Sequence, residues 1–214
     1  MNQTSSLSIS STQMIALGLL LTLLLIPIPG LAFNNLQEYL TAFKDKHVDV
    51  RRGAIEQLLD CLAEEKDCLE GGNSDAFRQL VTAIIELLDD PDPKVREAAI
   101  LYLKQSMDAR VIKPIARLLR DENDDVRAAA VESFYLMKVD GVTVRELERL
   151  LTDKNKRVRL GAVSSLGLSG TKKSVGLLRI ALTHETDQDA RGLYTQTIQE
   201  LEKRLAAKSP QDRK

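Results

Sequence analysis

Apolar residues recur along this chain at helical spacings, and the whole pattern returns at a nearly constant interval. Each copy contains a small aliphatic residue followed by arginine: Val50-Arg51, Val95-Arg96, Val126-Arg127, Val158-Arg159 and Ala190-Arg191. The last four copies are 31 or 32 residues apart. Further apolar residues stand four and eight positions after the aliphatic residue, which makes one apolar stripe on an α-helix. A repeat of this length is typical of stacked helical units.

Polar residues occupy fixed positions before each aliphatic residue. A carboxylate stands five positions before it: Asp45, Asp90, Asp121, Asp153 and Glu185. Three positions before it stand His47, Asp92, Asn123, Asn155 and Asp187. Asp and Asn side chains accept hydrogen bonds from free N–H groups at a helix start, so each unit contains a turn between a first helix, A, and a second helix, B. We interpret the recurring arginine and carboxylate as a structural ladder between units, not as a catalytic or phosphate-binding site.

The pattern predicts five pairs of helices. The expected A helices are residues 36–43, 75–89, 110–120, 143–151 and 173–183. The expected B helices are residues 49–65, 94–107, 124–138, 156–168 and 188–203. Because no stretch shows sustained alternation with a period of two, we expect no β-sheet. The predicted fold class is all-α, a right-handed α-α solenoid of about five helical hairpins.

Three stretches of the sequence point to a known kind of repeat. They are LLDDPDPKVREAAILYL, LLRDENDDVRAAAVESF and LLTDKNKRVRLGAVSSL. These resemble HEAT repeats, in particular the short HEAT-like repeats first recognised in phycobilisome lyases. The resemblance covers Leu36 to about Leu205. It implies the solenoid fold but says little about function, because very different proteins use this repeat.

We expect three regions along the chain. Residues 1–32 form a signal peptide or a membrane anchor, residues 33–205 form the repeat solenoid, and residues 206–214 form a disordered tail. The evidence for the first region is an almost wholly apolar run at residues 14–26, with no charged residue before Glu38.

The N-terminal segment leaves three interpretations open. Helix-breaking prolines followed by Gly30 and Ala32 predict a signal peptide cleaved before Phe33 and an exported chain, periplasmic or secreted. The alternative is a single-pass anchor over residues 14–33, about the 20 residues that span a membrane. Positive charges on its C-terminal side would then keep the repeats in the cytoplasm. The third interpretation is that the start of the chain is wrongly assigned. Any membrane contact would come from this segment alone, if it is uncleaved.

The charge balance limits the possible partners. The formal net charge is −1 and there is no Trp, so we expect no general attraction to nucleic acid. Charge is uneven along the chain, because residues 55–92 carry 11 acidic and 2 basic residues while residues 152–180 carry 7 basic and one acidic. Solvated helix faces explain this, and the alternative is a docking surface for a charged partner or head-to-tail self-association.

The only two cysteines, Cys61 and Cys68, leave two main interpretations. On one continuous helix they would be about 10.5 Å apart, too far for a disulfide. A disulfide therefore requires the helix to end near Glu65, and otherwise both are structural thiols. A metal site is disfavoured because zinc needs about four N or S ligands, and His47 and His184 are distant in sequence.

No catalytic motif stands out, so we expect no enzyme, cofactor or metal site. Deoxyhypusine hydroxylases resemble this chain in architecture, but they bind iron through several His-Glu pairs. This chain has the single pair His184-Glu185. The alternative function is a lyase-like or enzyme-accessory role on a protein-bound cofactor, which the likeness to phycobilisome lyases implies.

The preferred function is a non-catalytic scaffold for a protein or peptide partner. B helices of such solenoids usually line the concave face, and helical phase points positions two, six and nine after the aliphatic residue outward. The candidate partner-binding residues are Glu97, Leu101, Lys104, Glu132, Tyr135 and Leu160. The same phase also points Ala128 outward. Apolar anchors beside charges suit a peptide groove, although Leu101 and Tyr135 could instead pack against the adjacent repeat.

Overall fold

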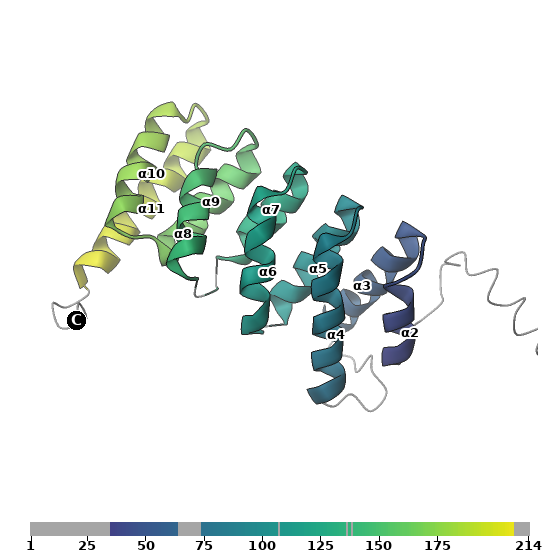
Figure 1. The fold of residues 1–214 in the computed structure, drawn as a ribbon. Coiled ribbons are helices and arrows are strands. Elements are labelled where there is room, and N and C mark those ends of the chain that lie inside the picture. Colours follow the sequence, from purple (N-terminus) through teal and green to yellow (C-terminus); the bar gives the residue numbers. More distant parts are fainter. Residues whose placement is uncertain (1–34, 64–73, 107, 136, 138, 208–214) are drawn as a thin grey trace, which may run out of the picture.

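The computed structural model describes residues 35–63, 74–106, 108–135, 137 and 139–207. Within those residues the chain forms ten α-helices and three short 3-10 helices, and no strand. Figure 1 shows the helices stacked in two layers in the order of the sequence. The predicted fold class, an all-α solenoid of five helical hairpins, is therefore confirmed.

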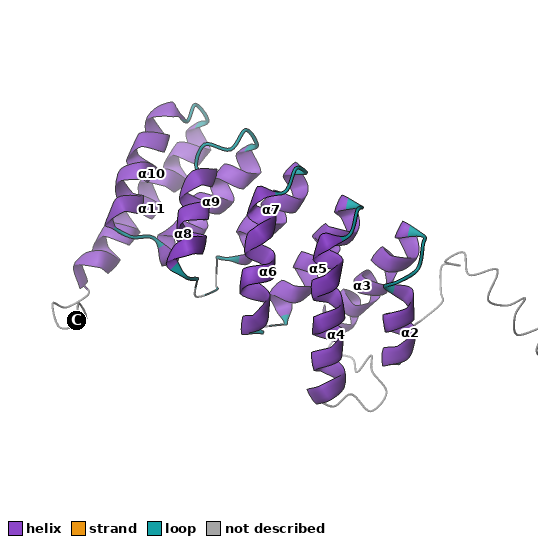
Figure 2. Ribbon diagram, viewed as in Figure 1, coloured by secondary structure: helices purple, strands orange, loops and turns teal. Residues whose placement is uncertain are grey.

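The two layers correspond to the predicted A and B helices. The A helices are α2 (Leu36–Ala42), α4 (Ser74–Glu86), α6 (Ile112–Arg117), α8 (Gly141–Leu150) and α10 (Lys172–His184). The B helices are α3 (Val48–Ala63), α5 (Pro93–Gln105), α7 (Asp124–Ser133), α9 (Lys156–Ser169) and α11 (Gln188–Ala207). Each B helix packs on the B helix of the next unit, and the turns from A to B lie along one edge of the stack (Figure 2).

Some helix ends differ from the prediction. The second and third A helices finish in 3-10 turns, η1 (Leu87–Asp89) and η3 (Leu118–Arg120), and η2 (Ala109–Val111) precedes α6. The third B helix ends at Ser133, not at the predicted residue 138, because the apolar residues after it pack into the turn that leads to α8: Phe134 is fully buried. At the other end, α11 continues to Ala207, two residues into the predicted tail.

The polar columns cap the B helices as predicted. The Asn123 side chain accepts hydrogen bonds from the backbone N–H groups of Asp125 and Val126 at 2.9 and 3.2 Å. Asn155 does the same one unit later. Each cap satisfies N–H groups that the first helical turn leaves free.

The arginine column forms the predicted ladder along the same edge. Each of the first four arginines donates two hydrogen bonds from Nε and Nη2 to the carboxylate of the next unit. The rungs are Arg51 to Asp90 (2.6 and 2.8 Å), Arg96 to Asp121 (2.8 and 2.8 Å), Arg127 to Asp153 (3.0 and 3.0 Å) and Arg159 to Glu185 (3.1 and 3.0 Å). The Nη1 group of each donates to a backbone carbonyl of its own turn. The ladder therefore fixes the turns and joins the units.

The electrostatics of a rung favour both charges. The hydrogen bond to Asp153 raises the pKa of Arg127 by more than burial lowers it. Burial alone would raise the pKa of Asp153, but the hydrogen bonds that it accepts from Arg127 and from the backbone N–H of Asn155 lower it overall. Both partners therefore stay ionised at neutral pH.

The apolar stripe of each B helix forms the core. Val95, Ala99 and Leu103 on α5 are fully buried, and so are Val126 and Ala130 on α7. Among the described residues no helix is long and apolar enough to span a membrane. Residues 1–34 and Cys68 lie outside the described residues, so the signal peptide, the anchor and the Cys61–Cys68 disulfide stay predictions.

Candidate functional site

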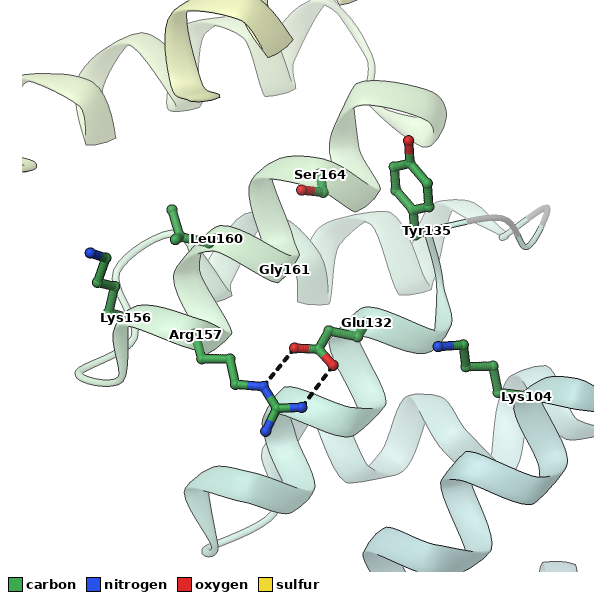
Figure 3. Close-up of a pocket in the computed structure, with 8 residues that line it drawn as sticks. All are labelled: Lys104, Glu132, Tyr135, Lys156, Arg157, Leu160, Gly161 and Ser164. Carbon is green, nitrogen blue, oxygen red and sulfur yellow. Dashed lines mark hydrogen bonds and ion pairs between the residues drawn. The ribbon is translucent and has the colours of Figure 1, made fainter. Parts of the chain in front are cut away.

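The B helices α5, α7 and α9 line an open pocket with a volume of about 780 Å³. Its lining residues are Lys104, Glu132, Tyr135, Lys156, Arg157, Leu160, Gly161 and Ser164. Figure 3 shows these residues on three successive B helices, with Tyr135 just beyond the end of α7, around one hollow. The structure thus brings together four of the six residues predicted to bind a partner: Lys104, Glu132, Tyr135 and Leu160.

The other two candidates, Glu97 and Leu101, do not line this pocket. The Glu97 carboxylate pairs with Lys94 at 3.2 Å, and Leu101 lies on the same helix with 36% of its surface exposed. Ala128, which helical phase places outward, is fully buried. That prediction was wrong because α7 is packed between α5 and α9, and a methyl side chain does not reach past its neighbours.

The hollow exists because small residues lie between large ones. A Cβ placed on Gly161 would lie 2.5 Å from Val131 Cγ1, so glycine lets α9 approach α7 closely. Ser164 is the next small residue on the same face of α9. Leu160 and Tyr135 rise on either side in Figure 3. The pocket can therefore receive an apolar side chain between them.

Tyr135 supplies the aromatic ring among the described residues that line the pocket, and 49% of its surface is accessible. It stands just beyond the end of α7 at Ser133. Leu160 is half-buried and packs against the core. Of the two packing interpretations that the sequence left open, an exposed Tyr135 agrees with an outward-facing anchor. Tyr is one of the residue types enriched among the few residues that supply most of the energy in protein interfaces.

Charged groups surround the hollow, and most are already paired. Arg157 donates from Nε to Glu132 Oε1 at 2.7 Å and from Nη2 to Oε2 at 2.9 Å. The hydrogen bond to Glu132 raises the pKa of Arg157, while burial opposes the rise. Lys156 contacts Asp187 of the next unit at 2.5 Å. Lys104 forms no ion pair with any described residue.

A family model described as HEAT repeats matches residues 36–134. This part of the chain therefore consists of HEAT repeats. The repeat columns continue beyond the matched residues in the two units that contain α8 to α11. No curated protein matches the chain.

Solved structures resemble the repeat array along most of its length. A crystal structure of an engineered protein is 17% identical, covers 78% of this chain and 79% of that chain, and gives a TM-score of 0.56. A designed armadillo repeat protein in complex with the peptide (KR)4 is 17% identical, covers 78% of this chain and 81% of that chain, and gives a TM-score of 0.51. A crystal structure of computationally designed armadillo repeat proteins for modular peptide recognition is 16% identical, covers 77% of this chain and 81% of that chain, and gives a TM-score of 0.50. At these identities the likeness shows the fold alone.

Sequence reasoning missed Lys156, Arg157 and Gly161 as members of the pocket. Arg157 directly precedes the repeated aliphatic residue, where the other four units carry Asp49, Lys94, Asp125 and Asp189. That column contains charges of both signs and therefore does not predict a basic residue in the fourth unit. The available signal was the reversal of charge against Asp125, the equivalent residue one unit earlier, within a basic stretch.

A second depression, of about 430 Å³, lies between the last two units of the repeat array and includes Arg159, His184, Glu185 and Tyr194. Arg159 and Glu185 are already a rung of the ladder, so this depression belongs to the structural edge. Among the described residues no group of three or more His, Cys, Asp or Glu is arranged to hold a metal ion.

Proposed function

We propose that this HEAT-repeat protein is a non-catalytic interaction scaffold that binds a peptide segment of a partner protein on α5, α7 and α9. The observation that carries the proposal is the hollow between Tyr135 and Leu160 over Gly161, with charges at its rim. A site of this kind combines apolar anchors with polar orientation, as peptide-binding surfaces do. The repeats supply a rigid surface because each unit is fixed to the next by a ladder rung.

The fold supports this proposal, because it is shared with designed armadillo repeat proteins, one of which is described as a complex with a peptide.

We further propose that the chain is exported, with a mature N-terminus at Phe33. The support is the apolar run of residues 14–26, which is followed by prolines and small residues. The test is the intact mass of the protein from soluble and membrane fractions of its native cells. A soluble species that begins at Phe33 supports export, and a full-length species confined to membranes contradicts it.

Selection from a random peptide library tests the binding function. The protein is immobilised, and enrichment is compared for wild type, Tyr135→Ala, Leu160→Ala and Ile180→Ala. Ile180 is the matched control because it is an exposed apolar residue, 59% accessible, on the A helix α10. We expect enriched sequences to lose binding to the first two variants and to keep binding to Ile180→Ala, with all melting temperatures similar. Enrichment that is insensitive to Tyr135 and Leu160 would place binding elsewhere. A chromophore bound to the purified protein would favour the enzyme-accessory alternative.

A further inference from the structure

The charges around the pocket are not equally available to a ligand. Three cations and one anion line it: Lys104, Lys156, Arg157 and Glu132. Glu132 is held by both hydrogen bonds from Arg157, so neither of these two groups needs a partner. A ligand that attracted Glu132 would first have to break that pair.

The acids farther along the same surface are also neutralised. Lys94 lies 3.2 Å from Glu97 and 3.9 Å from Asp125. On the other side of the pocket, Asp187 forms an ion pair with Lys156. Each carboxylate near the pocket therefore has a cation, whereas Lys104 has no anionic partner among the described residues.

Lys104 stands beside the apolar part of the hollow. It lies near the C-terminal end of α5 and is exposed. Figure 3 shows its ammonium group directed toward the middle of the pocket, between Glu132 and Tyr135. A ligand whose apolar side chain enters between Tyr135 and Leu160 would thus pass within reach of Lys104.

We propose that the occupant of this pocket is an acidic peptide segment of a partner protein. An apolar side chain fills the hollow between Tyr135 and Leu160, and a carboxylate beside it pairs with Lys104. The inference rests on the proposed function, and it adds the chemistry of the partner. The physical basis is charge complementarity, because the only unmatched charge that the described residues present at the pocket is positive.

Three immobilised pools of acetylated, amidated nonapeptides test the proposal. Each pool has Leu or Phe at its centre, and its flanking positions are drawn from Asp, Ser and Gly, from Lys, Ser and Gly, or from Ser and Gly alone. We expect wild-type protein to bind the acidic pool best and the basic pool least. The preference should weaken in 0.5 M salt because an exposed ion pair is screened.

Variants at Lys104 separate this inference from the proposed function. Lys104→Gln should lower affinity for the acidic pool about two- to fivefold, the effect of one exposed ion pair. Lys104→Glu should reverse the order of the acidic and basic pools. The matched control is Lys113→Glu, an exposed lysine on the A helix α6 with the same change of charge. It should leave the order unchanged.

The outcomes are distinguishable. Binding that depends on Tyr135 but favours the basic or neutral pool would retain the peptide-binding function and overturn the acidic preference. An acidic preference that Lys104→Gln leaves unchanged would also overturn it. If none of the pools binds and the library selection yields nothing, the proposed function itself fails.

Discussion

Two arginine–carboxylate pairs join the same two repeats, and their surroundings differ. Arg127 pairs with Asp153 on the turn edge, and Arg157 pairs with Glu132 on the B-helix surface. The buried pair has two hydrogen bonds of 3.0 Å, whereas those of the exposed pair are shorter, 2.7 and 2.9 Å. Side-chain exposure is 8% for both partners of the first pair but 49% and 35% for the second. Hydrogen-bond length alone would therefore give the wrong order for the contributions of the two pairs to stability.

What distinguishes the pairs is the number of other groups that depend on each. The Arg127 guanidinium also donates to the backbone carbonyls of Asp121 and Glu122, at 2.9 and 3.1 Å, and to Asp124. Arg157 has no such network among the described residues. The buried arginine therefore organises a turn and a repeat interface, whereas the exposed arginine adjusts the charge of a binding surface.

The largest expected effect comes from removing the buried arginine. Arg127→Ala leaves Asp153 buried without its cation and two carbonyls without a donor, so we expect a loss of about 3–5 kcal/mol in the free energy of unfolding. Urea denaturation measures it. Well below the melting temperature, peptide binding should change little. A loss of binding with unchanged unfolding would show that the ladder serves recognition instead.

The next largest effect concerns the helix contact between these two pairs. Gly161→Ala places a methyl group 2.5 Å from Val131 Cγ1, and overpacking of this kind costs about 1–3 kcal/mol. The control is Gly192→Ala on α11, where a Cβ meets nothing within 4 Å. There alanine should stabilise by about 0.5–1 kcal/mol because it suits a helix better than glycine. Thermal melting of both variants checks the opposite signs.

The ladder could be predicted from the sequence because its chemistry repeats. Arginine and carboxylate keep their offsets in every unit, so the pairing of one unit with the next follows from stacking alone. The pocket is different because it arises once. Arg157 reverses the charge of the Asp that three other units carry in its column. Gly161 stands in a column of variable residues, which holds Gly53, Ala98, Ala129 and Leu193 in the other units. Neither residue therefore has a period that reveals the pocket.

Two local errors have related physical causes. Helical phase gives a direction for Ala128 but does not say how far the neighbouring helices extend, and on α7 they cover it. The apolar residues after Ser133 continue the helical pattern, yet they fill the turn before α8. Apolar periodicity reports burial, and burial alone does not separate a helix end from a packed turn.

A third ion pair between units, Arg120 with Glu146, can be compared with the first two by acid titration. The hydrogen bond from Arg120 lowers the pKa of Glu146 from its usual 4.5 to about 2, with burial opposing and Arg149 assisting. Because the folded pKa lies below the unfolded one, the stabilisation is complete above pH 4.5 and is lost as the pH falls toward 2. Since Arg120 is 68% exposed, we expect a contribution of only about 1 kcal/mol.

Glu146→Gln tests this by urea denaturation at several pH values. The variant should be less stable than wild type at pH 7, and the difference should disappear near pH 2. A difference that stays constant across that range would mean that Glu146 acts through packing and not through its charge.

The smallest effect on stability should come from the exposed arginine. Arg157→Ala removes a pair that solvent screens, so we expect a loss of at most about 1 kcal/mol in the free energy of unfolding, well below that of Arg127→Ala. Binding should respond more visibly, because Glu132 then lies unpaired near Lys104 and offsets its charge. Affinity for the acidic peptide pool should fall about two- to fivefold, and Arg157→Ala/Glu132→Gln should restore it. A loss of stability equal to that of Arg127→Ala would show that burial does not separate the two pairs.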